Sequence, residues 1–368
     1  MDQRSLLIIS ACVLASAALL SFILSFFSRR WAVQSQVMDI PKSSRKIHKE
    51  PVPLWGGLGI ALTLLIALSL PIFQMLINGQ VLITKITFWQ IIGFAMGIII
   101  LCIGGMLDDK YELKAWKSLI FPILACLVVI LTGTSIVHVT NPGTSAAYFL
   151  NWWTWRPFGS LSFSFPSDLL TLVWMLVAIF ATKISDGLDG LVSGITFIGA
   201  ALVGVLSVMK TYFQPESAIL AAAVGGAYLG FLPKNMHPAK QFLGESGATI
   251  AGFCLGFLAI VSSAKIAIAL AVLAIPVADV AFVFLRRIYN RKPWYKGDDT
   301  HLHFRLLAAG IPHRTVVLLL WIVSASAGII ALTLQTRGKI FLVVTLALLT
   351  LLVSWLTDRM IKRRQSNV

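Results

Sequence analysis

The chain has 368 residues, of which 58% are hydrophobic and only 12% are charged, and its net charge is +15. This composition is far more apolar than that of a typical soluble domain, so it excludes an ordinary soluble globular protein. It predicts an integral membrane protein.

Eleven apolar runs approach the length of about 20 residues that a helix needs to cross a bilayer. In chain order they fall at about 5–27, 57–77, 89–106, 118–132, 167–184, 191–208, 217–232, 246–263, 265–285, 315–334 and 339–357. The first is too long for the core of a signal peptide and is followed at once by Arg29 and Arg30, so we expect a retained helix. We predict an all-α polytopic membrane protein that forms one domain over residues 1–368.

Lysines and arginines gather in alternate loops and predict the orientation. With the N-terminus outside, the inside loops carry 23 of the 30 basic residues, and an odd helix count places the basic tail 358–368 in the cytoplasm. The external loop 133–167 carries tryptophans and an alternating run typical of a small hairpin. The cytoplasmic loop 286–314 carries a histidine motif. Two explanations of the positive net charge remain open. One is membrane topology together with attraction to anionic lipid, and the other is an anionic substrate.

Acidic residues recur at the predicted cytoplasmic ends of the helices. Asp108 and Asp109 are adjacent carboxylates, which repel each other unless they are hydrated or share a cation or proton. Asp186 and Asp189 are three residues apart and each precedes a glycine, which allows a tight turn and a close approach of a ligand to the backbone. Because acids near a bilayer are costly, these pairs favour one cytoplasmic site over solvated loops.

Basic and histidine side chains accompany the acids in the same loops. They are Lys46, His48, Lys183, Lys240, His301, His303 and Arg305. The two histidines of the last loop lack a third ligand for zinc, so imidazole and guanidinium donors to phosphate oxygens fit better. A plain surface loop is the alternative.

Taken together, these stretches resemble the polyprenyl-phosphate N-acetylhexosamine-1-phosphate transferases, of glycosyltransferase family 4 type, over nearly the whole chain. The correspondence lies in Lys46-x-His48 with the following Pro51-x-Pro53 and Gly56-Gly57, Asp108-Asp109, Asp186-Gly-Leu-Asp189-Gly, Pro238-Ala239-Lys240 before a Gly-acid-x-Gly loop, and His301-Leu-His303. The stretch from His301 to Leu307 is similar to the His-Leu-His-His-Arg-Leu-Leu form of the N-acetylglucosamine-1-phosphate branch. The pentapeptide branch usually has three histidines followed by an acid.

The resemblance implies transfer of a sugar-1-phosphate, N-acetylglucosamine-1-phosphate in this branch, from a UDP-sugar to a polyprenyl phosphate. The products would be a polyprenyl-diphospho-sugar and UMP, formed at the cytoplasmic face of a bacterial inner (plasma) membrane as the first membrane step of a cell-envelope polysaccharide such as lipopolysaccharide or teichoic acid. The resemblance implies Mg²⁺ as the cofactor, with Mn²⁺ as a second option. A homodimer is one expected assembly, and no nucleic-acid partner is expected. The alternatives are a phospho-N-acetylmuramoyl-pentapeptide transferase, an inactive scaffold and, remotely, a transporter.

The resemblance also implies roles for single residues. Asp108 and Asp109 would activate or orient the lipid phosphate, Asp186 and Glu245 would hold the metal, and Asp189 would belong to the polar network of the catalytic aspartates. The phosphate or nucleotide contacts would come from Lys46, His48, Lys183, Lys240, His301, His303 and Arg305.

Three positions depart from the family pattern. Lys183 stands where an asparagine usually helps to hold magnesium, Glu245 replaces an aspartate, and Phe304 replaces a histidine. Glutamate can coordinate Mg²⁺, but a charged ammonium has no lone pair for a metal. Either the metal moves toward Glu245 and Asp186 while Lys183 contacts a phosphate, or the site has lost activity. The intact acids and basic residues favour the first account.

Overall fold

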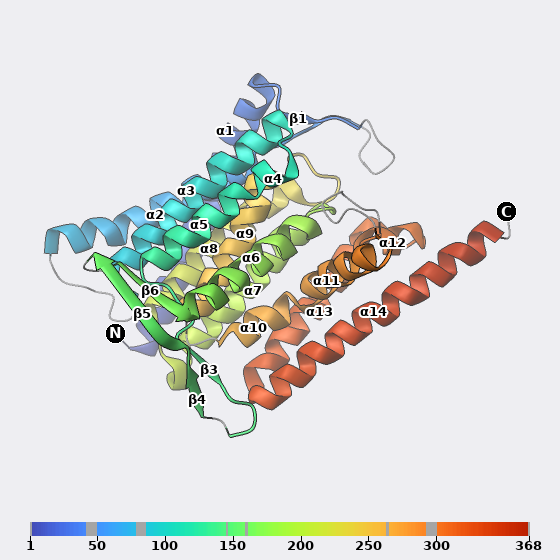
Figure 1. Cartoon of the computed structure of the whole chain (residues 1–368). Coiled ribbons are helices and arrows are strands. Elements are labelled where there is room, and N and C mark those ends of the chain that lie inside the picture. The colour runs from blue at the N-terminus through green and yellow to red at the C-terminus, as the bar shows by residue number, and fades with distance from the viewer. Residues whose placement is uncertain are drawn as a thin grey trace.

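The structure, a computed structural model, describes residues 2–41, 50–78, 86–144, 146–158, 161–262, 265–291 and 300–366. It is a bundle of long helices with short strands near its two ends (Figure 1). Lys46 and His48 lie outside the described residues, as do residues 292–299 of the predicted histidine loop.

Each of the eleven predicted apolar runs falls on helical structure. The helices are α1 (Gln3–Gln34), α2 (Gly56–Asn78), α3 (Phe88–Tyr111), α4 (Ala115–Ser118), α5 (Ile120–Leu131), α6 (Ser167–Ser185), α7 (Leu191–Val208), α8 (Pro215–Asn235), α9 (Gly244–Val261), α10 (Lys265–Val272), α11 (Ala274–Tyr289), α12 (Leu302–Ala308), α13 (His313–Thr333) and α14 (Thr336–Ser366), with a 3₁₀ turn at Lys210–Tyr212. Within the described ranges, eight helices are long and apolar enough to cross a membrane, and nine if α10 and α11 count as one span. The apolar helices Gly56–Leu70 and Ala115–Leu131 are shorter.

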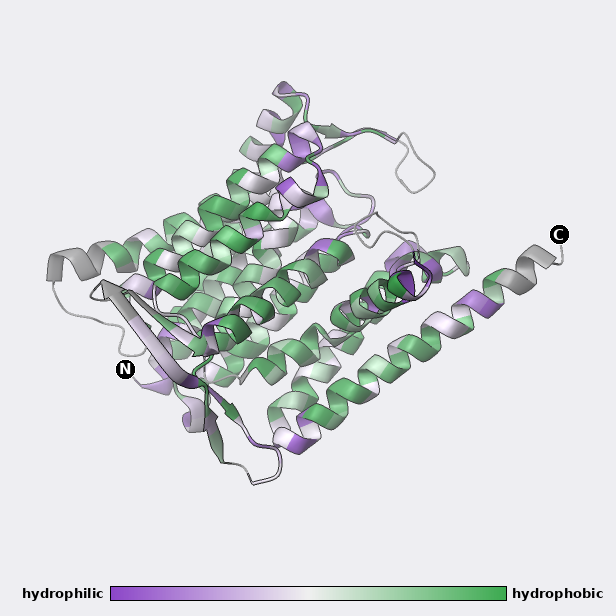
Figure 2. Cartoon of the chain, in the orientation of Figure 1, coloured by the Kyte–Doolittle hydropathy of each residue, from purple (hydrophilic) through white to green (hydrophobic). Residues whose placement is uncertain are grey.

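Hydrophobic residues run along the helices, and hydrophilic ones concentrate toward the helix ends (Figure 2). Many large apolar side chains of α1 and α14 are exposed, as expected for helices that face lipid rather than water. The chain is therefore a multi-pass membrane protein.

The single helix predicted at 265–285 is wrong in one respect, because α10 and α11 are bent by 74° at their junction. Pro276 lies in the first turn of α11. A proline has no N–H to donate to the carbonyl four residues earlier, and its ring clashes with that carbonyl. The proline therefore favours a break after Val272, where α10 ends.

The core of the bundle surrounds α9, which packs on α2, α3, α6, α7, α8 and α10. Phe94 of α3 stacks on Phe253 and Phe257 of α9, with ring centroids 5.5 and 4.3 Å apart. At the start of α9, a Cβ on Gly105 would come within 2.2 Å of the backbone nitrogen of Ser246. Small residues let helices approach closely in membranes, so this glycine brings the C-terminal part of α3 against the first turn of α9.

Among the described residues, three antiparallel strand pairs add to the helices. They are β1 (Met38–Asp39) with β2 (Val52–Pro53), β3 (His138–Thr140) with β4 (Ala147–Phe149), and β5 (Asn151–Phe158) with β6 (Leu161–Pro166). The β5–β6 pair leads directly into α6 and carries Trp152, Trp153 and Trp155, all more than half exposed. The β5–β6 pair lies beside the start of α6 (Figure 1), and the Asp186 turn follows the other end of that helix.

Candidate active site

A cavity of about 1270 Å³ opens at the end of the bundle where α3, α6 and α8 end and α9 begins. Its charged and histidine lining side chains are Arg29, Asp39, Glu50, Asp108, Asp109, Glu112, Lys183, Asp186, Asp189, His237, Lys240, Glu245 and His313. The four predicted catalytic aspartates and the predicted metal ligand Glu245 thus meet around one space. They come from three segments that are far apart in the sequence: the end of α3, the turn after α6 and the start of α9.

The two carboxylates at the end of α3 diverge. Asp108 accepts hydrogen bonds from the Ser118 hydroxyl at 2.6 Å and from the Leu113 backbone N–H at 2.9 Å. Asp109 accepts one from the backbone N–H of Glu245 at 2.9 Å, at the start of α9, where unpaired N–H groups and the helix dipole favour an anion. The other oxygen of Asp109, Oδ2, is buried and has no hydrogen-bond partner within the described ranges.

Lys183 and Glu245, two of the three positions that depart from the family pattern, form an ion pair with each other. Lys183 also donates a hydrogen bond of 2.9 Å to Ser118 Oγ, and Ser118 in turn donates to Asp108. One continuous chain therefore links Glu245, Lys183, Ser118 and Asp108. Ser118 is buried and was not predicted as a site residue, because a lone serine near a helix end carries no distinctive pattern.

The Asp186–Gly190 turn joins α6 to α7. Burial, together with the nearby carboxylates of Glu245, Asp109 and Asp189, raises the pKa of Asp186 well above its usual value. In the described part of the chain, its carboxylate has no hydrogen-bond partner. Gly187 is required by close packing, because a Cβ there would lie 2.5 Å from Nε2 of His303.

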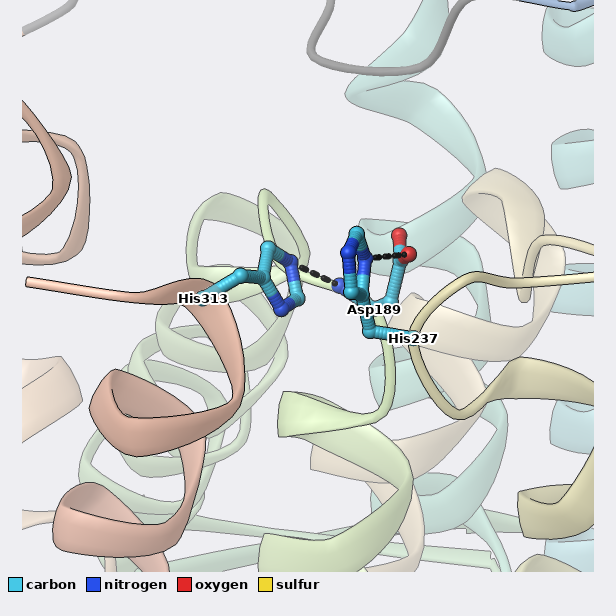
Figure 3. A group of neighbouring side chains, drawn as sticks. All are labelled: Asp189, His237 and His313. Carbon is cyan, nitrogen blue, oxygen red and sulfur yellow. Dashed lines mark hydrogen bonds and ion pairs between the residues drawn. The ribbon is translucent and has the colours of Figure 1, made fainter.

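Asp189 lies in a hydrogen-bonded group with two histidines (Figure 3). Its Oδ2 contacts Nδ1 of His237 at 2.8 Å and accepts from the Ala239 N–H at 3.1 Å. Its own backbone N–H donates to Nε2 of His313 at 3.2 Å, and the two histidine rings stack 4.1 Å apart. The three side chains are close enough for a metal ion, but the Asp189 carboxylate already contacts His237, and Nε2 of His313 already accepts from the Asp189 backbone N–H. The geometry fits a polar network that holds the wall of the cavity.

The residues of the histidine motif, His301 to Arg305, bond mainly to groups outside the cavity. His301 pairs with Asp279 of α11 at 2.9 Å, and Asp279 also accepts from the Leu302 N–H at 2.8 Å. Burial lowers the pKa of His303 to about 4, so this imidazole is neutral near pH 7. Of this stretch, Phe304 lines the cavity in the described structure, while His301 and His303 do not.

Arg305 is also buried away from the cavity. It pairs with Asp358 of α14 at 3.2 Å and donates to the Ser354 carbonyl at 3.2 Å. The structure thus does not bring His301, His303 and Arg305 to the place where their predicted phosphate contacts would be made. Asp279, which anchors His301, was missed, although a lone acid within an apolar helix is a recognisable signal.

Two other basic side chains reach the cavity. Lys240 is exposed and lines it, and Arg29 donates to the Lys240 carbonyl at 3.3 Å. His237 and His313 line it as well and were not predicted, although His237 immediately precedes the Pro238-Ala239-Lys240 motif. The cavity is therefore acidic at the helix ends and basic or imidazole-rich along its rim.

The donors fit a divalent cation. Mg²⁺ prefers oxygen ligands and is usually bound by one or two carboxylates with water and substrate phosphates. Asp186 lines the cavity without a bonded partner in the described chain, and Asp109 offers the partnerless Oδ2. Oε1 of Glu245 could join them only if its ion pair with Lys183 opened.

Comparison with known proteins agrees with this arrangement. The sequence model of glycosyl transferase family 4 matches residues 91–263, which include Asp108, Asp109, Lys183, Asp186 and Glu245. The chain is 30% identical over 324 residues to the phospho-N-acetylmuramoyl-pentapeptide-transferase of Moorella thermoacetica, covering 85% of this chain and 93% of that protein. The chain belongs to glycosyl transferase family 4. The resemblance predicted from the five motifs is confirmed.

Other members of the family are similar over almost the same length. The chain is 28% identical over 344 residues to a Bacillus subtilis protein named probable undecaprenyl-phosphate N-acetylglucosaminyl 1-phosphate transferase, covering 91% of this chain and 87% of that protein. It is 28% identical over 376 residues to the decaprenyl-phosphate N-acetylglucosaminephosphotransferase of Mycolicibacterium smegmatis, covering 92% and 87%. These similarities support the branch of the family that the His301–Leu307 stretch predicted.

Proposed function

We propose that this protein transfers N-acetylglucosamine-1-phosphate from UDP-N-acetylglucosamine to a polyprenyl phosphate. The products are a polyprenyl-diphospho-N-acetylglucosamine and UMP, made at the cytoplasmic face of a bacterial inner membrane as the first membrane step of a cell-envelope polysaccharide. The observation that carries the proposal is the meeting of Asp108, Asp109 and Asp186 in one cavity at the ends of apolar helices. A lipid phosphate and a soluble nucleotide can both reach such a place.

In the proposed reaction, an oxygen of the lipid phosphate attacks the β-phosphorus of the UDP-sugar. A new P–O bond joins the two phosphates of the product, and the bond from the β-phosphorus to the bridging oxygen breaks, so that UMP leaves with that oxygen. A phosphate monoester is already mostly ionised near neutral pH, so a strong base is not required. The demands on the protein are position and charge neutralisation.

The residues of the cavity match those demands. Asp108 and Asp109 are fixed by hydrogen bonds from opposite sides, which suits them to orient the attacking phosphate and its partners. Lys240 on the rim is placed for a phosphate contact, and Lys46 and His48 keep that role as an expectation from the sequence. Asp189, held by His237, would form part of the nucleotide end of the cavity. His301 and Arg305 would support the wall instead of contacting substrate.

We assign Mg²⁺ to the oxygens of Asp186 and Asp109, with Mn²⁺ as a substitute and Glu245 as a further ligand when it is released. When bound, the ion neutralises charge on the diphosphate. Asp186 and Asp109 would hold it beside the turn, and Gly187 lets the backbone there approach His303 closely.

The phospho-N-acetylmuramoyl-pentapeptide transferase reaction is the second candidate, because relatives with that name match at 29–30% identity. The test is UMP release by the purified protein with undecaprenyl phosphate and Mg²⁺, offered either UDP-N-acetylglucosamine or UDP-N-acetylmuramoyl-pentapeptide. We expect release with the first donor, lost when lipid, donor or metal is omitted. Release with the pentapeptide donor alone would select the second candidate, and release with neither by a folded sample would refute both.

A further inference from the structure

The ion pair between Lys183 and Glu245 places a positive charge inside the acidic cavity. The two side chains are 22% and 21% exposed, so water screens them less than it screens a surface pair. The same ammonium donates to Ser118, whose hydroxyl donates to Asp108. One lysine thereby engages Glu245 directly and Asp108 through a single hydroxyl.

This arrangement affects any metal in two ways. First, the oxygen of Glu245 that contacts the ammonium is not available to a cation in the same conformation. Second, an ammonium in contact with Glu245 repels a divalent ion bound to Asp109 and Asp186, which line the same cavity. Both effects weaken the binding of a metal to the protein alone.

Asp109 and Asp186 form no ion pair with Lys183 in the described structure. Oδ2 of Asp109 is buried without a partner within the described residues, and Asp109 and Asp186 both line the cavity. Two carboxylates and water make an incomplete site for Mg²⁺, which commonly gains its remaining ligands from substrate phosphates.

We propose that the Lys183 ammonium is a built-in positive charge of the site, which neutralises Glu245 and leaves Asp109 and Asp186 as the metal ligands. A divalent ion therefore binds firmly only together with the diphosphate of the substrate. The inference rests on the proposed function for the presence of a metal and a diphosphate. It goes beyond that function in stating the order of binding. The lysine is thus compatible with activity, because it changes when the metal binds and not whether it binds.

The test measures the binding of Mn²⁺ to the full chain in detergent, first without any substrate. Electron paramagnetic resonance detects the bound ion. Lys183→Asn removes the ammonium and frees Glu245, and we expect it to bind Mn²⁺ at least about tenfold more tightly than the unchanged protein. The double variant Lys183→Asn with Glu245→Gln should lose that gain, because the freed ligand is gone. For the unchanged protein, UDP-N-acetylglucosamine should tighten Mn²⁺ binding at least about tenfold beyond the affinity of the nucleotide alone.

Lys117→Asn is the matched control. Lys117 is exposed, lies next to Ser118 in the sequence and does not line the cavity in the described structure, so its loss changes the net charge equally. Its Mn²⁺ affinity should equal that of the unchanged protein. An equal gain in this variant, no gain in Lys183→Asn, or a gain that survives Glu245→Gln would each overturn the proposal.

The unchanged protein provides a test that depends on no variant. Tight Mn²⁺ binding without substrate would contradict the proposal even if Lys183→Asn did not fold. Because the binding experiment without substrate does not involve transfer, it is independent of the sugar specificity. Failure to release UMP from UDP-N-acetylglucosamine would refute the proposed function and leave the measured role of Lys183 in metal affinity unchanged.

Discussion

Replacing Ser118 with alanine tests the hydrogen-bonded chain that links α4 to Asp108 of α3 and Lys183 of α6. Ser118 is 8% exposed, and its hydroxyl donates to Asp108 at 2.6 Å and accepts from Lys183 at 2.9 Å. Alanine leaves Asp108 with the Leu113 N–H and leaves Lys183 with Glu245. Both side chains therefore keep one partner and lose the bond that fixes their relative position.

The magnitude follows from those two bonds. A hydrogen bond to a charged group contributes about 1.5–3 kcal/mol, and a loss of that size from the transition state corresponds to about 10- to 150-fold in rate. Because the cavity admits water, which replaces part of the lost bonding, we expect a fall in kcat near tenfold for Ser118→Ala. The KM for the UDP-sugar should change less, since the serine does not line the cavity in the described structure.

The assay is UMP release at saturating donor and lipid, with folding checked by thermal unfolding in detergent. Ser118→Thr retains the hydroxyl and should recover most of the rate. Ser324→Ala in α13, a buried serine that does not line the cavity, is the control for the loss of a hydroxyl in the bundle. A folded Ser118→Ala protein with unchanged kcat would refute the role assigned to the chain from Lys183 to Asp108.

Three further changes are predicted. Asp186→Asn should lower turnover at least about 100-fold in a protein that still folds, because a proposed metal ligand is lost; near-normal UMP release would remove Asp186 from the mechanism. Gly187→Ala should lower kcat by about tenfold or more, because its Cβ would lie 2.5 Å from His303; rates equal to the unchanged enzyme would show that the turn is not tightly held. The pKa of His303 is about 4 in the folded protein and about 6.5 in an unfolded chain, so the unfolded state binds more protons between these two pH values. The free energy of unfolding should therefore fall as the pH drops from 6.5 to 4, by up to about 3 kcal/mol. Thermal unfolding at stepped pH checks this, and a His303→Asn variant with the same pH slope would contradict it.

The membrane helices could be predicted from the sequence, because an apolar run of the right length has few other stable structures in a bilayer. The run at 191–208 coincides with α7 (Leu191–Val208). The bend between α10 and α11 lies within one apolar run, and only Pro276 signals it in the sequence. Length and hydropathy detect spans and are insensitive to breaks inside them.

The acids of the site could also be placed in one group, since the helix count put Asp108, Asp109, Asp186 and Asp189 on one face. Their partners could not be predicted. Ser118 meets Lys183 across 65 residues, and that contact depends on how α4 packs beside α6.

The partners of the histidine motif could not be predicted either. Its residue types suit phosphate, but His301 is buried against Asp279 of α11, and Arg305 is buried against Asp358 of α14. Residue chemistry thus indicated what these side chains can bind, while tertiary packing decided which partner they meet.

The central claim is that a sugar-1-phosphate, and not a sugar alone, is moved to the lipid. The most direct measurement uses UDP-N-acetylglucosamine labelled with ³²P at the β-phosphorus, together with undecaprenyl phosphate, Mg²⁺ and the purified protein, followed by separation of lipid and aqueous products. We predict that the label moves into the lipid fraction while unlabelled UMP forms in equal amount. Label that stays in the aqueous fraction as UDP while sugar enters the lipid, or no transfer by a folded protein, would contradict the account.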